Sequence, residues 1–223
     1  MTAPVDFRRG AVAASERRGA NAVTPAAPTV GVRFALYTGL LSALFASLPW
    51  VVGPVGAGVF RENGPLEWLQ VAVLALAAVL CARAARAQPQ RRILLAVLAG
   101  GFALCVVREM DSMYQSLMPE TSRKTPAYIA GAILLAAMIH LRQRLLPQLL
   151  EFVPTRGFAL LWVGGMTAGV FAQLVGNGDL LESLLGEHYV RIHKRMIEEA
   201  GETFGYLLLL VGVIETVLSR ERD

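Results

Sequence analysis

Six ionisable side chains lie at the ends of long apolar segments, where their chemistry suits cation binding or proton exchange. An ionisable group at the edge of hydrocarbon is costly unless partners or water shelter it, and such groups usually mark a functional site. Carboxylates that face one another inside a helical bundle can bind a divalent cation or share a proton. The sequence therefore predicts a ligand-binding pocket for a cation, either a proton or a divalent metal. Its predicted residues are Glu67, Arg108, Glu109, Asp111, Glu199 and Glu202.

The segment 187–206, EHYVRIHKRMIEEAGETFGY, is the richest in such groups. Glu198 and Glu202 are four residues apart and so share one face of a helix. His188 and His193 are five residues apart, and on a straight helix they diverge by about 140°. They would ligate one metal ion together only if the helix breaks between them. The candidate metal ligands are His188, His193 and Glu198, which with Glu62 form the predicted rim of the pocket.

Six apolar runs must position these side chains. Hydrophobic residues make up 55% of the chain and its mean hydropathy is +0.50, which is too apolar for an ordinary soluble domain. Short polar loops separate the runs, as is typical of membrane-spanning α-helices, whose backbone hydrogen bonds are satisfied internally. The sequence predicts an all-α polytopic membrane bundle of six transmembrane helices. The runs are 34–52, 66–82, 93–107, 128–141, 158–176 and 203–218.

The charges divide unevenly between the two sets of connections. The predicted inner side carries fourteen basic and six acidic residues, net +8, and the other side carries seven basic and eleven acidic residues, net −4. By the positive-inside rule both termini lie in the cytoplasm, the N-in/C-in topology. We therefore expect a multi-pass protein of a bacterial-type inner (plasma) membrane. The net charge of +4 indicates this orientation and an attraction to anionic lipid headgroups, and not nucleic-acid binding.

The chain is predicted to contain one folded domain preceded by a tail. Residues 1–32 are rich in Ala, Arg, Pro and Val without periodicity, which is typical of disorder, so we expect a disordered cytoplasmic tail. Residues 33–223 are expected to form the six-helix transmembrane domain. Between the fourth and fifth runs, the leucine spacing of LRQRLLPQLLEFVPTRG suits a short helix on the cytoplasmic interface. Cys81 and Cys105 lie inside apolar runs and are expected to pack as small core residues.

The length of the third run places acidic residues inside the membrane. Spanning about 30 Å of hydrocarbon takes about 20 helical residues, but the run 93–107 provides only about 22 Å. If Arg92 lies at the inner interface, Arg108, Glu109 and Asp111 complete the span within the outer leaflet. Arg108 and Asp111 are one helical turn apart, so we expect them to form an ion pair.

Each predicted site residue also has a structural explanation. Glu67 lies near the start of its span, where a carboxylate interacts favourably with the positive end of the helix dipole. The expected pair between Arg108 and Asp111 would serve equally well to hold a helix end in place. Histidines at the membrane surface are commonly solvated and have no ligand at all.

Three classes of function follow from these residues. The leading hypothesis is that the pocket binds a cation in a transport or sensing role. The second is a non-catalytic subunit or assembly factor of a membrane complex, whose acid–Arg contacts hold helices together or dock a membrane-protein partner. The third is a metal-dependent hydrolase acting on lipid, with Glu or Asp as general base and His188 or His193 helping to bind the metal. The lipid bilayer is the partner that the sequence requires, and a divalent metal is the cofactor that these residue types suggest.

The predicted topology can be tested by labelling engineered cysteines with a membrane-impermeant reagent. Because residue 120 lies on the predicted outer side and residue 88 on the inner side, Glu120→Cys should react in intact cells and Gln88→Cys only after lysis. The reverse pattern would place the predicted pocket on the cytoplasmic face.

Overall fold

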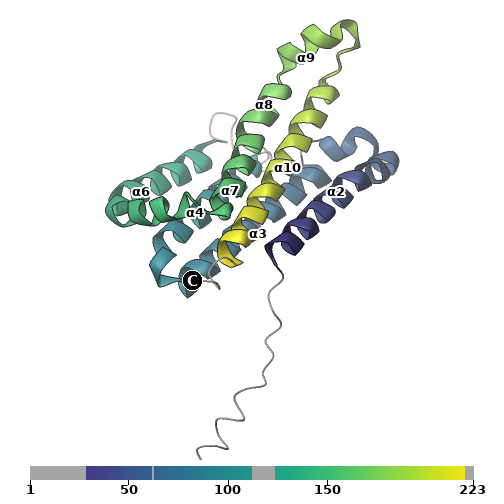
Figure 1. The fold of residues 1–223 in the computed structure, drawn as a ribbon. Helices are drawn as coiled ribbons and strands as arrows, with labels where there is room; N and C mark the ends of the chain where they lie inside the picture. Colours follow the sequence, from purple (N-terminus) through teal and green to yellow (C-terminus); the bar gives the residue numbers. More distant parts are fainter. Residues whose placement is uncertain (1–28, 62, 112–123, 219–223) are drawn as a thin grey trace, which may run out of the picture. The chain divides into compact units, whose positions relative to one another are not determined.

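The computed structural model describes residues 29–61, 63–111 and 124–218, and these residues form eight α-helices joined by short 3-10 and π-helical turns (Figure 1). Glu62 and most of the predicted tail, residues 1–32, lie outside the described residues. The helices are α2 (Val30–Val55), α3 (Pro65–Ala87), α4 (Arg92–Glu109), α6 (Thr125–Phe152), α7 (Arg156–Met166), α8 (Ala172–Val175), α9 (Gly178–Leu185) and α10 (Arg191–Leu218). The turns are η1 (Gly56–Phe60), η2 (Pro89–Arg91), η4 (Thr167–Phe171) and η5 (Gly186–His188).

The chain divides into two compact units, Met1–Ala43 and Leu44–Asp223. The boundary falls within α2, whose 26 residues are mostly apolar. The second unit holds every predicted pocket residue, and the packing described below is internal to that unit.

Five helical segments are long and apolar enough to cross a membrane, or six if the two legs of α6 count as one span. The all-α class and the multi-pass membrane character predicted from the sequence are thereby supported. The N-in/C-in orientation and the identity of the membrane stay predictions. The five segments are Val30–Pro54, Pro65–Ala87, Pro89–Glu109, Arg156–Val175 and Arg191–Leu218.

Helix α6 bends by 91° between its two legs, Thr125–His140 and Arg142–Phe152. One face of the second leg packs against the hydrophobic core, where Leu145 and Phe152 are buried. On the same face the Gln148 side-chain oxygen accepts a hydrogen bond of 2.9 Å from the backbone N–H of Leu94. That N–H belongs to the first turn of α4, where backbone donors have no partner within the helix. The bend therefore makes residues Arg142–Phe152 a separate amphipathic helical segment, in the region where the sequence predicts a short helix.

Glycines bring α10 into close contact with the segment formed by α7, η4 and α8, which lies beside it (Figure 1). A Cβ atom on Gly205 would lie 2.5 Å from the backbone nitrogen of Ala168, and one on Gly164 would lie 2.8 Å from the carbonyl oxygen of Gly205. Gly201 and Gly212 extend the same close approach towards the two ends of α10. Small residues at three- and four-residue spacings allow helix backbones to pack closely within a membrane. We call these contacts the small-residue seam. They hold α10 close to its neighbour and set which face of α10 is turned towards it.

A matched pair of glycine variants tests the small-residue seam. Gly205→Ala would force a methyl group into the backbone of α7–η4, and overpacking of this kind costs about 1–3 kcal/mol. Gly165→Ala has open space around its new Cβ and gains about 1 kcal/mol of helix propensity. In detergent, the melting temperature should fall for Gly205→Ala and stay equal or rise for Gly165→Ala. Equal melting temperatures would contradict the close contact.

Candidate functional site

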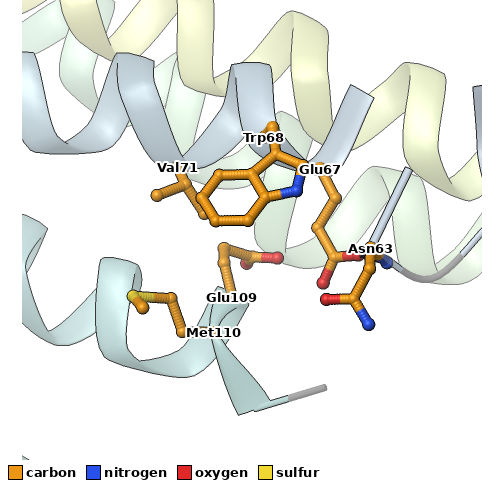
Figure 2. Close-up of a pocket in the computed structure, with 6 residues that line it drawn as sticks. All are labelled: Asn63, Glu67, Trp68, Val71, Glu109 and Met110. Carbon is orange, nitrogen blue, oxygen red and sulfur yellow. Dashed lines mark hydrogen bonds between the residues drawn. The ribbon is translucent and has the colours of Figure 1, made fainter. Parts of the chain in front are cut away.

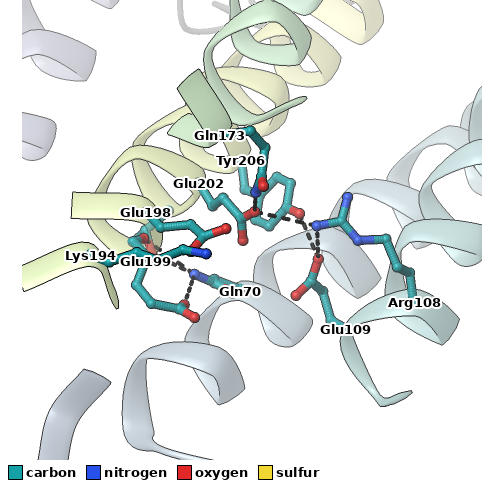
Figure 3. Close-up of polar contacts among 10 residues, drawn as sticks. Gln70, Arg108, Glu109, Gln173, Lys194, Glu198, Glu199, Glu202 and Tyr206 are labelled. Carbon is teal, nitrogen blue, oxygen red and sulfur yellow. Dashed lines mark hydrogen bonds and ion pairs between the residues drawn. The ribbon is translucent and has the colours of Figure 1, made fainter. Parts of the chain in front are cut away.

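A network of polar side chains joins α3, α4, α8 and α10 inside the second unit (Figure 3). Its centre is Glu202, which lies on the buried face of α10. One Glu202 carboxylate oxygen, Oε1, accepts hydrogen bonds from Gln173 Nε2 at 2.7 Å and from Arg108 Nη2 at 3.3 Å. An acid placed inside an apolar bundle is thus held by an amide from one neighbouring helix and a guanidinium from another.

Arg108 lies between two carboxylates on different helices. Its Nη2 atom is 3.3 Å from Glu202 Oε1 and 3.5 Å from Glu109 Oε1. The Arg108 side chain is 55% exposed, whereas the Glu109 and Glu202 side chains are 10% and 7% exposed. The Tyr206 hydroxyl donates a hydrogen bond of 2.6 Å to the same Glu109 oxygen. The guanidinium of Arg108 therefore contacts two carboxylates that are both largely buried.

Gln70 provides the link from α3 to α10. Its side chain is 1% exposed, and its Nε2 atom lies 2.9 Å from Glu199 Oε2, 3.3 Å from the Glu199 backbone oxygen and 2.9 Å from Thr203 Oγ1. The Gln70 Oε1 atom is also buried, and within the described residues it has no hydrogen-bond partner. A buried polar atom without a partner is rare and costly. Gln70 therefore presents an acceptor that a bound donor group could satisfy.

The π-helical turn η4 ends at Phe171, two residues before Gln173, in the span Arg156–Val175. A π turn holds more residues than an α turn and commonly occurs near functional sites. Here it accompanies a seam that keeps the small Ala168 and Ala172 buried and leaves the bulky Phe171 59% exposed. Gln173 lies on α8, after this turn, and donates a hydrogen bond to Glu202 on α10. The irregular turn and the small residues together allow the amide to approach the buried acid.

A small pocket lies between the start of α3 and the end of α4 (Figure 2). Its volume is about 10 Å³, about the minimum that one water molecule requires. Glu67 accepts a hydrogen bond from the backbone N–H of Asn63, so its carboxylate also stabilises the first turn of α3. The pocket is lined by Asn63, Glu67, Trp68, Val71, Glu109 and Met110.

The structure brings most of the predicted pocket residues into two connected groups. Glu202, Arg108 and Glu109 are in direct contact, and Glu199 lies on the same helix as Glu202 and contacts Gln70. Glu67 shares the small pocket with Glu109. Thus the side chains that the sequence assigns to three separate spans do converge, with Glu109 common to both groups.

The expected ion pair between Arg108 and Asp111 does not form. Helix α4 ends at Glu109, and Met110 has a non-helical ψ of 6°, so Asp111 is no longer one regular turn above Arg108. The guanidinium turns to Glu109 and Glu202 instead. Asp111 Oδ1 is buried and has no hydrogen-bond partner in the part of the chain that the structure describes.

The candidate metal ligands lie apart from one another. His188 is exposed in η5, and the helix breaks before α10 begins at Arg191. His193 Nδ1 accepts a hydrogen bond of 3.3 Å from the backbone N–H of Val190, an arrangement that caps the start of α10. Glu198 lies 4.0 Å from the ammonium group of Lys194. Across residues 29–61, 63–111 and 124–218, no three His, Cys, Asp or Glu side chains are placed to hold one metal ion.

Four members of the network were not predicted from the sequence: Gln70, Gln173, Thr203 and Tyr206. All four lie within the apolar runs, and none of them carries a charge at neutral pH. A glutamine inside an apolar span also requires a hydrogen-bond partner, because an unsatisfied polar group is costly there. This rule, applied to amides as well as acids, would have identified Gln70 and Gln173.

The contact between Arg108 and Glu202 can be tested by rescue. Arg108→Ala leaves two buried carboxylates without their shared cation, and loss of a partner to a buried acceptor costs about 1–3 kcal/mol. We expect a lower melting temperature in detergent than for Arg61→Ala, whose side chain is exposed. Adding Glu202→Gln to Arg108→Ala should recover part of the loss, and adding Asp111→Asn should recover none. Recovery by Asp111→Asn alone would contradict the observed pairing.

In comparisons with protein-family models, curated proteins and solved structures, nothing matches this chain. The membrane character of the helices and the geometry of the polar network are therefore what support a function.

Proposed function

We propose that this multi-pass membrane protein binds a cation, specifically a proton, at its buried carboxylate network and uses it in a transport or sensing role. The proposed site comprises Glu67, Arg108, Glu109, Asp111, Glu199 and Glu202. We further propose that the protein resides in a bacterial-type inner membrane with both termini in the cytoplasm. The observation that carries the cation site is the sharing of one Arg108 nitrogen by two buried carboxylates, Glu109 and Glu202.

The charge balance of the network favours a bound cation. Glu109, Glu199 and Glu202 bring three carboxylates, and the guanidinium of Arg108 contacts two of them, Glu109 and Glu202. Uncompensated charge in an apolar interior is strongly unfavourable, because the surroundings cannot solvate it. A cation bound among the acids would remove this penalty. The network is thus expected to be more stable with a proton bound than with all three acids ionised.

Size and hydrogen bonding favour a proton as the bound cation. The pocket beside Glu67 and Glu109 has about the volume of one water molecule, which leaves little room for a hydrated metal ion. A protonated carboxylic acid supplies an O–H donor that the ionised form lacks. The unpartnered Gln70 Oε1 atom is buried beside Glu199 and could accept from such a donor.

The same contacts would connect proton binding to helix packing. Arg108 ties α4 to α10, Gln173 ties α8 to α10, and Gln70 ties α3 to α10. Neutralising Glu202 would weaken its attraction to Arg108 and leave the amide contact in place. A switch of this kind needs a local charge change and a packing element that responds to it. The network offers the first, and the Arg108 side-chain link between α4 and α10 offers the second.

A second candidate is a non-catalytic subunit or assembly factor of a membrane complex. One observation favours it: α9 exposes the apolar side chains of Leu180, Leu184 and Leu185. An exposed apolar patch rimmed by polar residues is typical of a protein or membrane contact. In this case the acid–Arg contacts would serve to orient α10 for the partner.

Infrared difference spectroscopy of the protein in lipid nanodiscs tests the proton site. A pH titration should reveal the carbonyl stretch of a protonated carboxylic acid in wild type, because a proton bound at Glu202 creates that group. Glu202→Gln should lose most of the band, since an amide cannot be protonated in this way while it can still accept from Gln173.

Glu182→Gln is the matched control, because Glu182 is an exposed acid on α9. It should leave the band attributed to Glu202 unchanged. A wild-type spectrum without such a band, or a band that persists in Glu109→Gln, Glu199→Gln and Glu202→Gln alike, would mean that these three acids are ionised and purely structural. The subunit hypothesis would then be preferred.

A further inference from the structure

An apolar groove lies in the angle of the bent helix α6, away from the carboxylate network. Both legs of α6 contribute to it, and its volume is about 490 Å³. This falls within the range of about 300–1,000 Å³ that is usual for sites that bind small molecules. The groove is lined by Leu135, Met138, Ile139, Arg142, Gln143, Leu145, Leu146 and Leu149.

One positive charge stands at the corner of this otherwise apolar surface. Arg142 begins the second leg directly after the bend, and its side chain is exposed. Within the described residues it forms no ion pair or hydrogen bond through its side chain. Gln143, next to it, adds a neutral group that can donate hydrogen bonds. The groove therefore presents a basic and hydrogen-bonding end joined to a hydrocarbon surface.

The second leg is held firmly enough to keep this geometry. Leu145 and Phe152 anchor it in the core, and the Gln148 side chain bonds the first turn of α4. Leu150 remains exposed outside the groove, which suits a leg that lies against lipid. An amphipathic helix with basic residues and exposed leucines is typical of the membrane interface.

We propose that this groove binds one anionic phospholipid. An acyl chain lies against Leu135, Met138 and Ile139, and the phosphate group contacts Arg142 and Gln143 at the corner. Charge complementarity selects the headgroup, because an arginine that has no ion pair within the described residues meets a phosphate ester. Guanidinium groups bind phosphate through paired hydrogen bonds, and basic pockets beside membrane-spanning helices hold anionic headgroups. This site is separate from the proposed cation site and does not depend on it.

Native mass spectrometry of the detergent-purified protein tests the proposal, with phosphatidylglycerol and phosphatidylcholine as the added lipids. Wild type should retain one phosphatidylglycerol more tightly than phosphatidylcholine. Arg142→Gln should bind phosphatidylglycerol about fivefold more weakly, as expected for the loss of one basic contact to an anionic lipid. Arg83→Gln is the matched control, since Arg83 is an exposed arginine on α3 that does not line the groove.

A second variant tests the apolar part of the groove without altering its charge. Leu135→Trp should fill the groove and weaken phosphatidylglycerol binding, because Leu135 is 58% exposed and a larger side chain there would occupy the space of the acyl chain. The melting temperature without lipid should match wild type for all three variants.

Four results would overturn the proposal. Equal affinity for the two lipids would mean that the groove is covered by lipid without selection. Equal losses in Arg142→Gln and Arg83→Gln would indicate a general attraction to basic surface. Unchanged phosphatidylglycerol binding in Leu135→Trp would show that the acyl chain does not lie in the groove. If inorganic phosphate alone raised the melting temperature of the protein as much as phosphatidylglycerol does, the corner would be a site for the free anion.

Discussion

The contact of Arg108 with two carboxylates is the constraint that connects α4 to α10, two helices that each pack mainly against other helices of the second unit. Glu109 and Glu202 come from different helices and are largely buried, and an ionised carboxylate without a partner is strongly unfavourable in an apolar bundle. The guanidinium is planar and offers several donors in a fixed geometry. It can therefore interact with two carboxylates at once, whereas a compact cation would be a poorer partner for both. The positions of α4 and α10 are coupled by this requirement.

The close approach of α10 to α7, η4 and α8 makes the rest of the network possible. Gly205 and Gly164 allow backbone contact, so the short amide side chain of Gln173 can reach Glu202. With larger residues on this seam, the helices would stand further apart and the acid would lose one of its two donors. Close packing by small residues thus allows one of the two hydrogen bonds to Glu202 to form.

The two cavities suit different ligands because their linings differ. The pocket beside Glu67 and Glu109 is lined by both acidic and apolar side chains and is about the size of a water molecule, which suits a proton or one bound water. The groove of α6 is far larger and almost entirely apolar, with one arginine at its corner, which suits an amphiphile. A polar network in an apolar interior is selective because each unsatisfied group is costly. An apolar groove gains selectivity only from the charged group at its edge.

The sequence by itself determined the all-α class, the number of apolar spans to within one, and the acids that would need shelter. These follow from composition and segment length, which do not depend on how the helices pack. It also indicated that acids from the second, third and sixth runs would meet. It did not determine the partners: the predicted Arg108–Asp111 pair assumed that α4 continues past Glu109, whereas the helix ends there. The contacts of Gln70, Gln173 and Tyr206 depend on the rotation of each helix about its axis. Only the tertiary structure decided that rotation, because it is set by the small-residue seam and the π turn, and a hydropathy pattern carries no information about which neighbour a buried side chain will face.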